Sequence, residues 1–243
     1  DGVTAAYGTP FTPLHHYAPW NVDDDGRPLP VCALGLDGLP LSALDGLLLG
    51  AFNTDRFGQL LRNYTSFAVG DDGVHKYIAK PHQYFAVSRA IAATITAYRT
   101  NGKAGVVWHT QGAGKSLEME FFTHLVQRHP ALENPTVVVI TDRTELDGQL
   151  RASFQKSRLL AEAPLAIKTR AQLRDELTGR RTGGILFTTL QKFGRTKDER
   201  DSGSGHPLLS DRRNIVVIVD EAHRSHYDDL DGYARHLRDA LPN

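Results

Sequence analysis

The stretch Val106–Ser116 (VVWHTQGAGKS) decides the fold, because an apolar run leads into a glycine-bearing loop and a helix start. Gly112 and Gly114, on either side of Ala113, let backbone N–H groups close around an anion, since no Cβ blocks the approach. The following helix adds the positive end of its dipole. Lys115 can reach β- and γ-phosphates, and the Ser116 hydroxyl can ligate Mg²⁺. The stretch predicts a phosphate-binding loop; an ordinary tight turn is the alternative.

Apolar runs alternate with helical stretches along most of the chain. We predict strands at residues 105–108, 136–141, 165–168, 184–189 and 214–219, and helices at 82–99, 117–128, 145–154, 171–177 and 229–241. This alternation predicts an α/β fold with a parallel sheet and helices on both faces. Ligands of such sheets bind beyond the carboxyl ends of the strands. Residues 197–205 (KDERDSGSG) are predicted to form a mobile loop.

The first eighty residues differ in composition from the rest. Residues 1–40 are rich in Gly, Pro and Asp, which predicts irregular or hairpin structure. Residues 41–49 are apolar, and Thr54 or Asp55 can cap a helix that continues to Leu61. We therefore divide the chain into an irregular segment at 1–40, a small helical segment at 41–80 and a main domain at 81–243.

The composition limits the possible partners and environment. Lys plus Arg and Asp plus Glu both number 28, but residues 1–75 hold three basic against nine acidic side chains. Residues 143–200 hold thirteen basic against seven acidic side chains, which points either to a polyanion or, as charge alone favours, to solvated helix faces. The single cysteine, Cys32, excludes an intrachain disulfide and indicates a reducing compartment. No apolar run approaches the roughly 18–20 residues of a transmembrane helix, so we expect no membrane partner.

A second decisive stretch is Ile215–His223 (IVVIVDEAH), in which two carboxylates follow a buried strand. Asp220 at the strand end can hold Mg²⁺ on the phosphates, and Glu221 can accept a proton from the water that attacks the γ-phosphorus. His223, one turn further, is better placed to relay the state of the site than to do chemistry. An acidic pair that caps a helix is the alternative interpretation.

These motifs together resemble a known family. The Asp-Glu-Ala-His and Gly-Ala-Gly-Lys-Ser strings resemble motifs II and I of superfamily two helicases and translocases. The longer strings at 108–116, 141–149 (TDRTELDGQ), 188–193 (TTLQKF) and 220–227 (DEAHRSHY) resemble the motor (R) subunit of type I restriction enzymes. The strict phosphate-loop motif has glycine where this chain has His109, and histidine is ordinary there in the restriction family. The resemblance covers roughly residues 40–243 and implies a RecA-like P-loop NTPase lobe at 81–243, with residues 1–40 as a linker or the trailing edge of a missing nuclease domain.

The resemblance also implies roles for individual residues. ATP and Mg²⁺ would be the cofactors, with Lys115 and Glu221 catalytic. Gln83 would hydrogen-bond adenine, although a solvent-facing glutamine at a helix start is the alternative. Arg143, Thr188 and Thr189 would contact the DNA backbone without base specificity. The implied partners are double-stranded DNA and the modification and specificity subunits of a type I restriction complex, in a bacterial or archaeal cytoplasm.

The family's other domains are not recognisable in this sequence. The chain has no nuclease signature and no second motor lobe that donates arginines to the γ-phosphate, so we expect a fragment with poor isolated turnover. Such an arginine contributes ~10³–10⁵ in rate in related phosphoryl-transfer systems. The alternatives are another superfamily two machine, such as a type III restriction subunit or a chromatin-type translocase, and a P-loop scaffold that does not hydrolyse ATP.

Overall fold

The computed structural model describes residues 4–30, 33–35, 38–70, 73–141, 144–220 and 232–243, with only the backbone described at 144–147 and 149. The chain forms two compact units. Unit 1 comprises residues 1–91, 106–124 and 156–159, and unit 2 comprises residues 92–105, 125–155 and 160–243. Each unit has its own fold, and each is described by itself.

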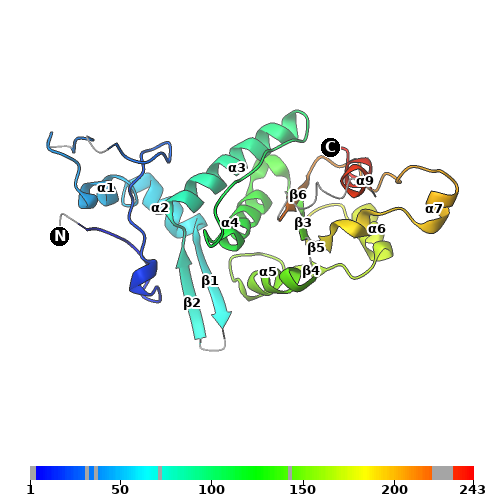
Figure 1. Cartoon of the computed structure of the whole chain (residues 1–243), viewed down its shortest axis with the longest axis horizontal. Helices are drawn as coiled ribbons and strands as arrows, with labels where there is room; N and C mark the ends of the chain where they lie inside the picture. The colour runs from blue at the N-terminus through cyan, green and yellow to red at the C-terminus, as the bar shows by residue number, and fades with distance from the viewer. Residues whose placement is uncertain (1–3, 31–32, 36–37, 71–72, 142–143, 221–231) are drawn as a thin grey trace. The chain divides into compact units, whose positions relative to one another are not determined.

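Unit 2 is built on a parallel sheet of four strands in the order β4-β5-β3-β6 (Figure 1). The strands are β3 (Thr136–Thr141), β4 (Leu165–Ala166), β5 (Ile185–Thr189) and β6 (Ile215–Val219). β3 pairs in parallel with β5 on one edge and with β6 on the other. All six residues of β3 are buried, as expected for a central strand of a parallel sheet. The predicted α/β class and parallel sheet are confirmed.

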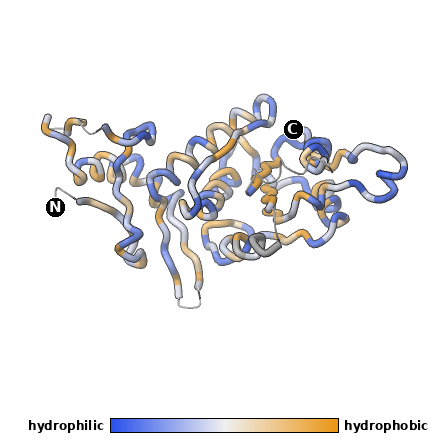
Figure 2. The backbone as a smooth tube through the Cα atoms, in the orientation of Figure 1, coloured by the Kyte–Doolittle hydropathy of each residue, from blue (hydrophilic) through white to orange (hydrophobic). Residues whose placement is uncertain are grey.

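Unit 2 also contains helices and one-turn helices, most of which contribute buried side chains to its core, whereas the short helix at Lys197–Asp201 buries none of its residues. They are η2 (Pro130–Leu132), α5 (Thr144–Lys156), α6 (Arg170–Gly179), η3 (Leu190–Phe193), α7 (Lys197–Asp201) and α9 (Tyr233–Ala240). Leu173 and Leu177 of α6 and Phe193 of η3 share one buried cluster with Ile140 and Leu186 of the sheet. Figure 2 shows the strands of unit 2 as largely apolar and the α7 segment as hydrophilic. No helix in the described ranges has the length and apolar character needed to cross a membrane.

Two predictions for loop segments are wrong. The strand predicted at residues 105–108 is absent from the described ladders, and Val106 and Trp108 are 82% and 81% exposed. Apolar character alone does not make a strand; its backbone groups must also find a ladder. Residues 197–201, predicted as part of a mobile loop, form α7 because Thr196 and Glu199 make a reciprocal capping box at its start.

Unit 1 combines short helices with a hairpin. Its elements are η1 (Leu14–His16), α1 (Ala43–Leu49), α2 (Thr54–Asn63), β1 (Thr65–Gly70) and β2 (Gly73–Ile78). The long helices α3 (Pro81–Arg99) and α4 (Lys115–Arg128) each contribute their N-terminal part to it. The two predicted short helices are confirmed, but the cap of α2 is Asn53 rather than Thr54 or Asp55. The antiparallel β1–β2 hairpin lies within the segment predicted to be helical.

Aromatic side chains form the core of unit 1. Trp20 is 2% exposed and its ring lies 6.0 Å from the rings of both Tyr7 and Tyr84. Tyr64 lies 4.8 Å from Tyr84 and 5.7 Å from Phe121 of α4. The hydroxyl of Tyr7 also donates to the carbonyl of Ala79 at 2.6 Å. The N-terminal segment thus packs into unit 1 through Trp20 and Tyr7.

A buried carboxyl group ties α4 to the hairpin. Glu120 of α4 is 3% exposed, and its Oε1 accepts hydrogen bonds from the hydroxyls of Ser66 in β1 and Ser157. Burial raises the pKa of Glu120, and the two serine hydrogen bonds oppose this rise. Because the folded chain holds this proton more tightly than the unfolded chain, the stabilisation is complete below the unfolded pKa. It is lost as the pH rises through the folded pKa.

We predict that Glu120→Gln removes this dependence on pH, because the neutral amide oxygen still accepts from the serines. Urea denaturation of the wild type should show a falling free energy of unfolding as the pH rises from 4.5 towards neutrality. The variant should lack this component, whereas Glu162→Gln, at an exposed position, should keep it. Parallel pH profiles for Glu120→Gln and wild type would contradict the assignment.

Candidate nucleotide-binding site

The loop before α4 has the backbone of a phosphate cradle. Gly112 and Gly114 adopt φ angles of +81° and +86°, a region that side chains disfavour. A Cβ at Gly114 would lie 2.5 Å from Nε2 of Gln83, whereas a Cβ at Gly112 would meet nothing within 4 Å. Glycine is therefore required at both positions by conformation, and at Gly114 also by space.

The side chain of Gln83 in α3 makes hydrogen bonds to the backbone of this loop. Its side chain is buried, its Nε2 lies 3.2 Å from the Ala113 carbonyl and 3.3 Å from the Gly114 carbonyl, and it donates to both. Its Oε1 accepts from the backbone N–H of Lys80 at 2.8 Å. The solvent-facing alternative for Gln83 is wrong. Because both ends of the amide are engaged, the side chain fixes the loop in this conformation.

Lys115 and Ser116 stand at the first turn of α4, where unpaired helix N–H groups favour an anion. The Nζ of Lys115 lies 3.5 Å from the carbonyl of His109, and Ser116 is exposed. A cationic amine, a hydroxyl and a glycine loop at one helix start are the groups that hold nucleotide phosphates and their Mg²⁺. The donor set and the shape of the loop therefore fit a nucleoside triphosphate.

His109 takes part in an interaction that sequence reasoning missed. Its Nδ1 lies 2.7 Å from Oε1 of Glu118, in the first turn of α4, and Glu118 is 6% exposed. His82 of α3 adds a third group, with Nε2 at 2.9 Å from the Ala113 carbonyl. The acidic residue near a predicted helix start was the available signal, because a carboxylate is stabilised there.

Three more of the predicted site residues, Thr188, Thr189 and Asp220, lie at the carboxyl end of the sheet in unit 2. Thr141 of β3 pairs in register with Thr189 of β5, and the N–H of Asp220 donates to the Ile140 carbonyl at 2.9 Å. Asp220 thus follows β6 at the same edge, as predicted. Thr188 and Thr189 are 0% and 8% exposed. Their burial does not support contact with DNA through these hydroxyls, which stays a prediction.

The predicted site residues fall into three groups. Gln83, Gly112, Ala113, Gly114, Lys115 and Ser116 come together in unit 1. Asp220, Thr188 and Thr189 come together in unit 2. Arg143, Glu221 and His223 lie outside the described residues. The phosphate loop thus belongs to unit 1, and the described strand ends belong to unit 2.

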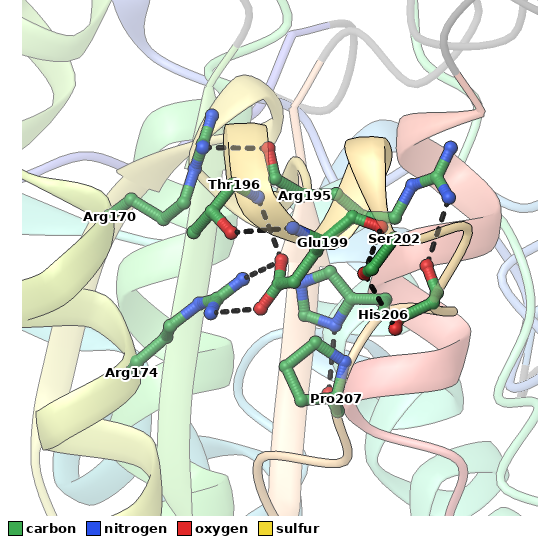
Figure 3. Close-up of polar contacts among 9 residues, drawn as sticks. Arg170, Arg174, Arg195, Thr196, Glu199, Ser202, His206 and Pro207 are labelled. Atoms are coloured by element: carbon green, nitrogen blue, oxygen red, sulfur yellow. Dashed lines mark hydrogen bonds and ion pairs between the residues drawn. The ribbon is translucent and has the colours of Figure 1, made fainter.

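Several side chains of the basic stretch are engaged within unit 2 (Figure 3). Arg174 binds Glu199 with two hydrogen bonds of 2.6 and 2.9 Å, and Arg170 donates to the Arg195 carbonyl. Chiefly through the Arg174 hydrogen bonds, with the N–H of Thr196 adding to the effect, the pKa of Glu199 falls to about 2. Arg170 and Arg174 are therefore more than solvated side chains of a helix face. Their hydrogen bonds connect α6 to the Arg195 carbonyl and to Glu199 of α7.

A glycine loop at a helix start and a parallel sheet with a carboxylate after one strand define an α/β protein of the P-loop nucleotide-binding class. Residues 82–243 match the family described as SWI2/SNF2 ATPase. The chain belongs to this family.

The chain is also similar to proteins named as type I restriction enzyme endonuclease subunits. It is 39% identical over its whole length to the HindI endonuclease subunit of Haemophilus influenzae. It is 37% identical over its whole length to a putative endonuclease subunit of Methanocaldococcus jannaschii, and 29% identical over 62% of its length to one of Staphylococcus aureus. It spans 23% of the first two proteins and 15% of the third. These similarities confirm the resemblance seen in the sequence strings.

We predict a graded response to alanine at the loop glycines. Gly112→Ala should lower the free energy of unfolding by about 1–2 kcal/mol because of its positive φ. Gly114→Ala should cost about 1–3 kcal/mol and weaken nucleotide binding further, because it also displaces Gln83. Thermal denaturation with and without ATP measures both effects.

Gly58→Ala is the matched control, since α2 offers open space at Gly58. It should leave nucleotide binding unchanged and should not destabilise the chain. A Gly114→Ala variant that matches wild type in both measurements would refute the proposed loop geometry.

We also predict that Glu199→Gln lowers the free energy of unfolding by about 1–3 kcal/mol at neutral pH, because it breaks a charge-assisted pair. Since the folded pKa lies below the unfolded value, the difference should vanish as the pH falls from 4.5 towards 2. Arg235→Ala, in a more exposed pair at 3.9 Å, should change stability by about 0–1 kcal/mol. A pH-independent difference between Glu199→Gln and wild type would argue against this role.

Proposed function

We propose that the chain is the ATP-binding first motor lobe of a type I restriction endonuclease R subunit. In this proposal ATP hydrolysis drives translocation of double-stranded DNA before cleavage, in a complex with modification and specificity subunits in a bacterial or archaeal cytoplasm. The observation that carries the proposal is the glycine loop braced by Gln83 at the start of α4. The SWI2/SNF2 ATPase match and the names of the relatives support it.

In this proposal the residues of unit 1 bind the triphosphate. Backbone N–H groups around Gly112 and Gly114 surround the phosphates, and Lys115 neutralises their charge. The hydroxyl of Ser116 and the carboxylate of Asp220 are the groups that would hold Mg²⁺, which would offset the negative charge that develops on the phosphates. Glu221 accepts the proton of the attacking water, and His223 relays the state of the site.

The proposed adenine contact of Gln83 has a structural condition. Its amide donates to the Ala113 and Gly114 carbonyls and accepts from the N–H of Lys80. A contact in which this amide donates to adenine therefore requires Nε2 to give up one of the two carbonyls, whereas Oε1 has a second lone pair for the base. Gln83 would then couple the presence of the base to the conformation of the phosphate loop.

DNA binding is proposed for Arg143, Thr188 and Thr189, together with basic side chains of residues 143–200. Contacts of this kind bind phosphates without reading sequence and weaken steeply with salt. Arg170, Arg174, Arg180 and Arg195 already make hydrogen bonds inside unit 2. The proposed contact therefore falls mainly to the other Lys and Arg residues of this stretch.

Two substitutions in the intact protein test the proposal. Lys115→Ala should abolish measurable ATP binding, because the loop loses its cation. Glu221→Gln should retain ATP and stop its hydrolysis, because an amide cannot accept the proton from water. Equilibrium binding of a labelled ATP and phosphate release with and without double-stranded DNA measure these outcomes.

Lys103→Ala, at an exposed position before the loop, is the control and should behave as wild type. Unchanged binding in Lys115→Ala and unchanged turnover in Glu221→Gln would favour a P-loop scaffold over a motor. ATP turnover that double-stranded DNA does not stimulate would oppose the translocase part alone.

A further inference from the structure

Three side chains with metal-binding chemistry gather on one side of the phosphate loop, all within unit 1. They are His82 at the start of α3, His109 before the glycines and Glu118 in the first turn of α4. One ring nitrogen of each histidine and a carboxylate oxygen of Glu118 all lie within 4.8 Å of one another. The proposed nucleotide chemistry uses none of these three side chains.

The distances place the carboxylate between the two imidazoles. Oε1 of Glu118 lies 2.7 Å from Nδ1 of His109 and 4.0 Å from Nε2 of His82. The two rings meet edge to face with their centroids 5.2 Å apart. Two imidazole nitrogens and one carboxylate oxygen are therefore close enough for a single ion to bring together.

Burial gives this cluster a reason to bind a cation. The Glu118 side chain is only 7% exposed, and a carboxylate removed from water is costly unless an opposite charge or donors compensate for it. Glu118 meets Nδ1 of His109 and the N-terminal turn of α4, and a divalent cation would add a full opposite charge beside the carboxylate. The His82 side chain is 40% exposed, so an ion can reach the cluster from solvent.

We propose that His82, His109 and Glu118 form a Zn²⁺ site with an open fourth position. Zinc takes nitrogen ligands at about 2.0–2.1 Å and carboxylate oxygens at about 2.0–2.2 Å, which sets tetrahedral ligand atoms about 3.4 Å apart. The 2.7 Å contact must open and the 4.0 Å contact must close, both by less than about 1 Å, which side-chain rotation provides. Two histidines and one glutamate are an established three-ligand set for zinc, whereas Mg²⁺ favours oxygen ligands.

Zinc binding at this site would act on the phosphate loop. Nε2 of His82 lies 2.9 Å from the Ala113 carbonyl, which can only accept, so without metal this nitrogen carries the proton. A metal ion on Nε2 displaces that proton and ends the hydrogen bond. The Ala113 carbonyl then keeps only the bond from Gln83. The site thus joins metal occupancy to the conformation of the loop.

The test uses Zn²⁺ alone, without nucleotide, on the intact protein that carries this chain. Isothermal titration calorimetry counts the bound ions, and the visible absorption of Co²⁺ in place of zinc reports a tetrahedral nitrogen and oxygen environment. We expect His82→Ala and Glu118→Gln each to lose one site or to weaken it by at least about tenfold. Glu118→Gln preserves the shape of the side chain, and circular dichroism checks that both variants fold.

His15→Ala is the matched control, because it removes an exposed imidazole elsewhere in unit 1. It should keep the site and its Co²⁺ spectrum. Equal zinc stoichiometry and affinity in wild type, His82→Ala and Glu118→Gln would overturn the proposal. Since the assay contains no ATP, its failure would leave the nucleotide proposal standing.

Discussion

The hydrogen bonding of β3 on both of its edges is the constraint on which unit 2 depends. β3 pairs with β5 through Val137–Thr141 and with β6 through Thr136–Ile140, always in parallel. The carboxyl ends of paired parallel strands lie at the same edge of the sheet. Thr141, Thr189 and Asp220 therefore lie close together although they are distant in sequence. The full burial of β3 makes any other register costly, because its backbone groups would lose their partners. The position of the acidic residue is thus a consequence of strand pairing.

The phosphate loop depends on a different kind of support. Its glycines permit the conformation, but they do not select it, because glycine also populates many other conformations. The amide of Gln83 makes the selection by bonding the Ala113 and Gly114 carbonyls. His109 and Glu118 add a second brace on the same loop. A loop held before its ligand arrives loses less conformational entropy on binding.

Charge in this protein has two structural roles with opposite responses to pH. The Arg174–Glu199 pair stabilises the ionised carboxylate, so its contribution grows as the pH rises from about 2 to 4.5. Buried Glu120 favours its protonated form, so its contribution falls as the pH rises. The difference has two causes: burial raises the pKa of Glu120 against the opposing hydrogen bonds of two serines, whereas the Arg174 guanidinium lowers the pKa of Glu199. Composition alone, with its equal numbers of acidic and basic residues, could not distinguish the two.

The sequence by itself determined the class of the fold and most of the elements. The apolar runs at 136–141, 184–189 and 214–219 correspond to β3, β5 and β6, because strands covered on both faces are continuously apolar. It also identified the glycine loop and Asp220, since their chemistry depends on residue type and local spacing. The β1–β2 hairpin escaped prediction because its strands are only half buried and carry a weaker pattern.

Only the tertiary structure decided which side chains meet across the chain. The exposed position of Val106–Trp108 could not be read from their apolar character, because a strand requires ladder partners. Gln83 and Gly114 are separated by thirty-one residues, and Glu199 and Arg174 by twenty-five, so no local pattern pairs them. Likewise, His82, His109 and Glu118 come from three segments and converge only when α3 and α4 fold around the loop. A local motif can be recognised from neighbouring residues in the sequence. Which distant side chains meet depends on how the elements that carry them pack together.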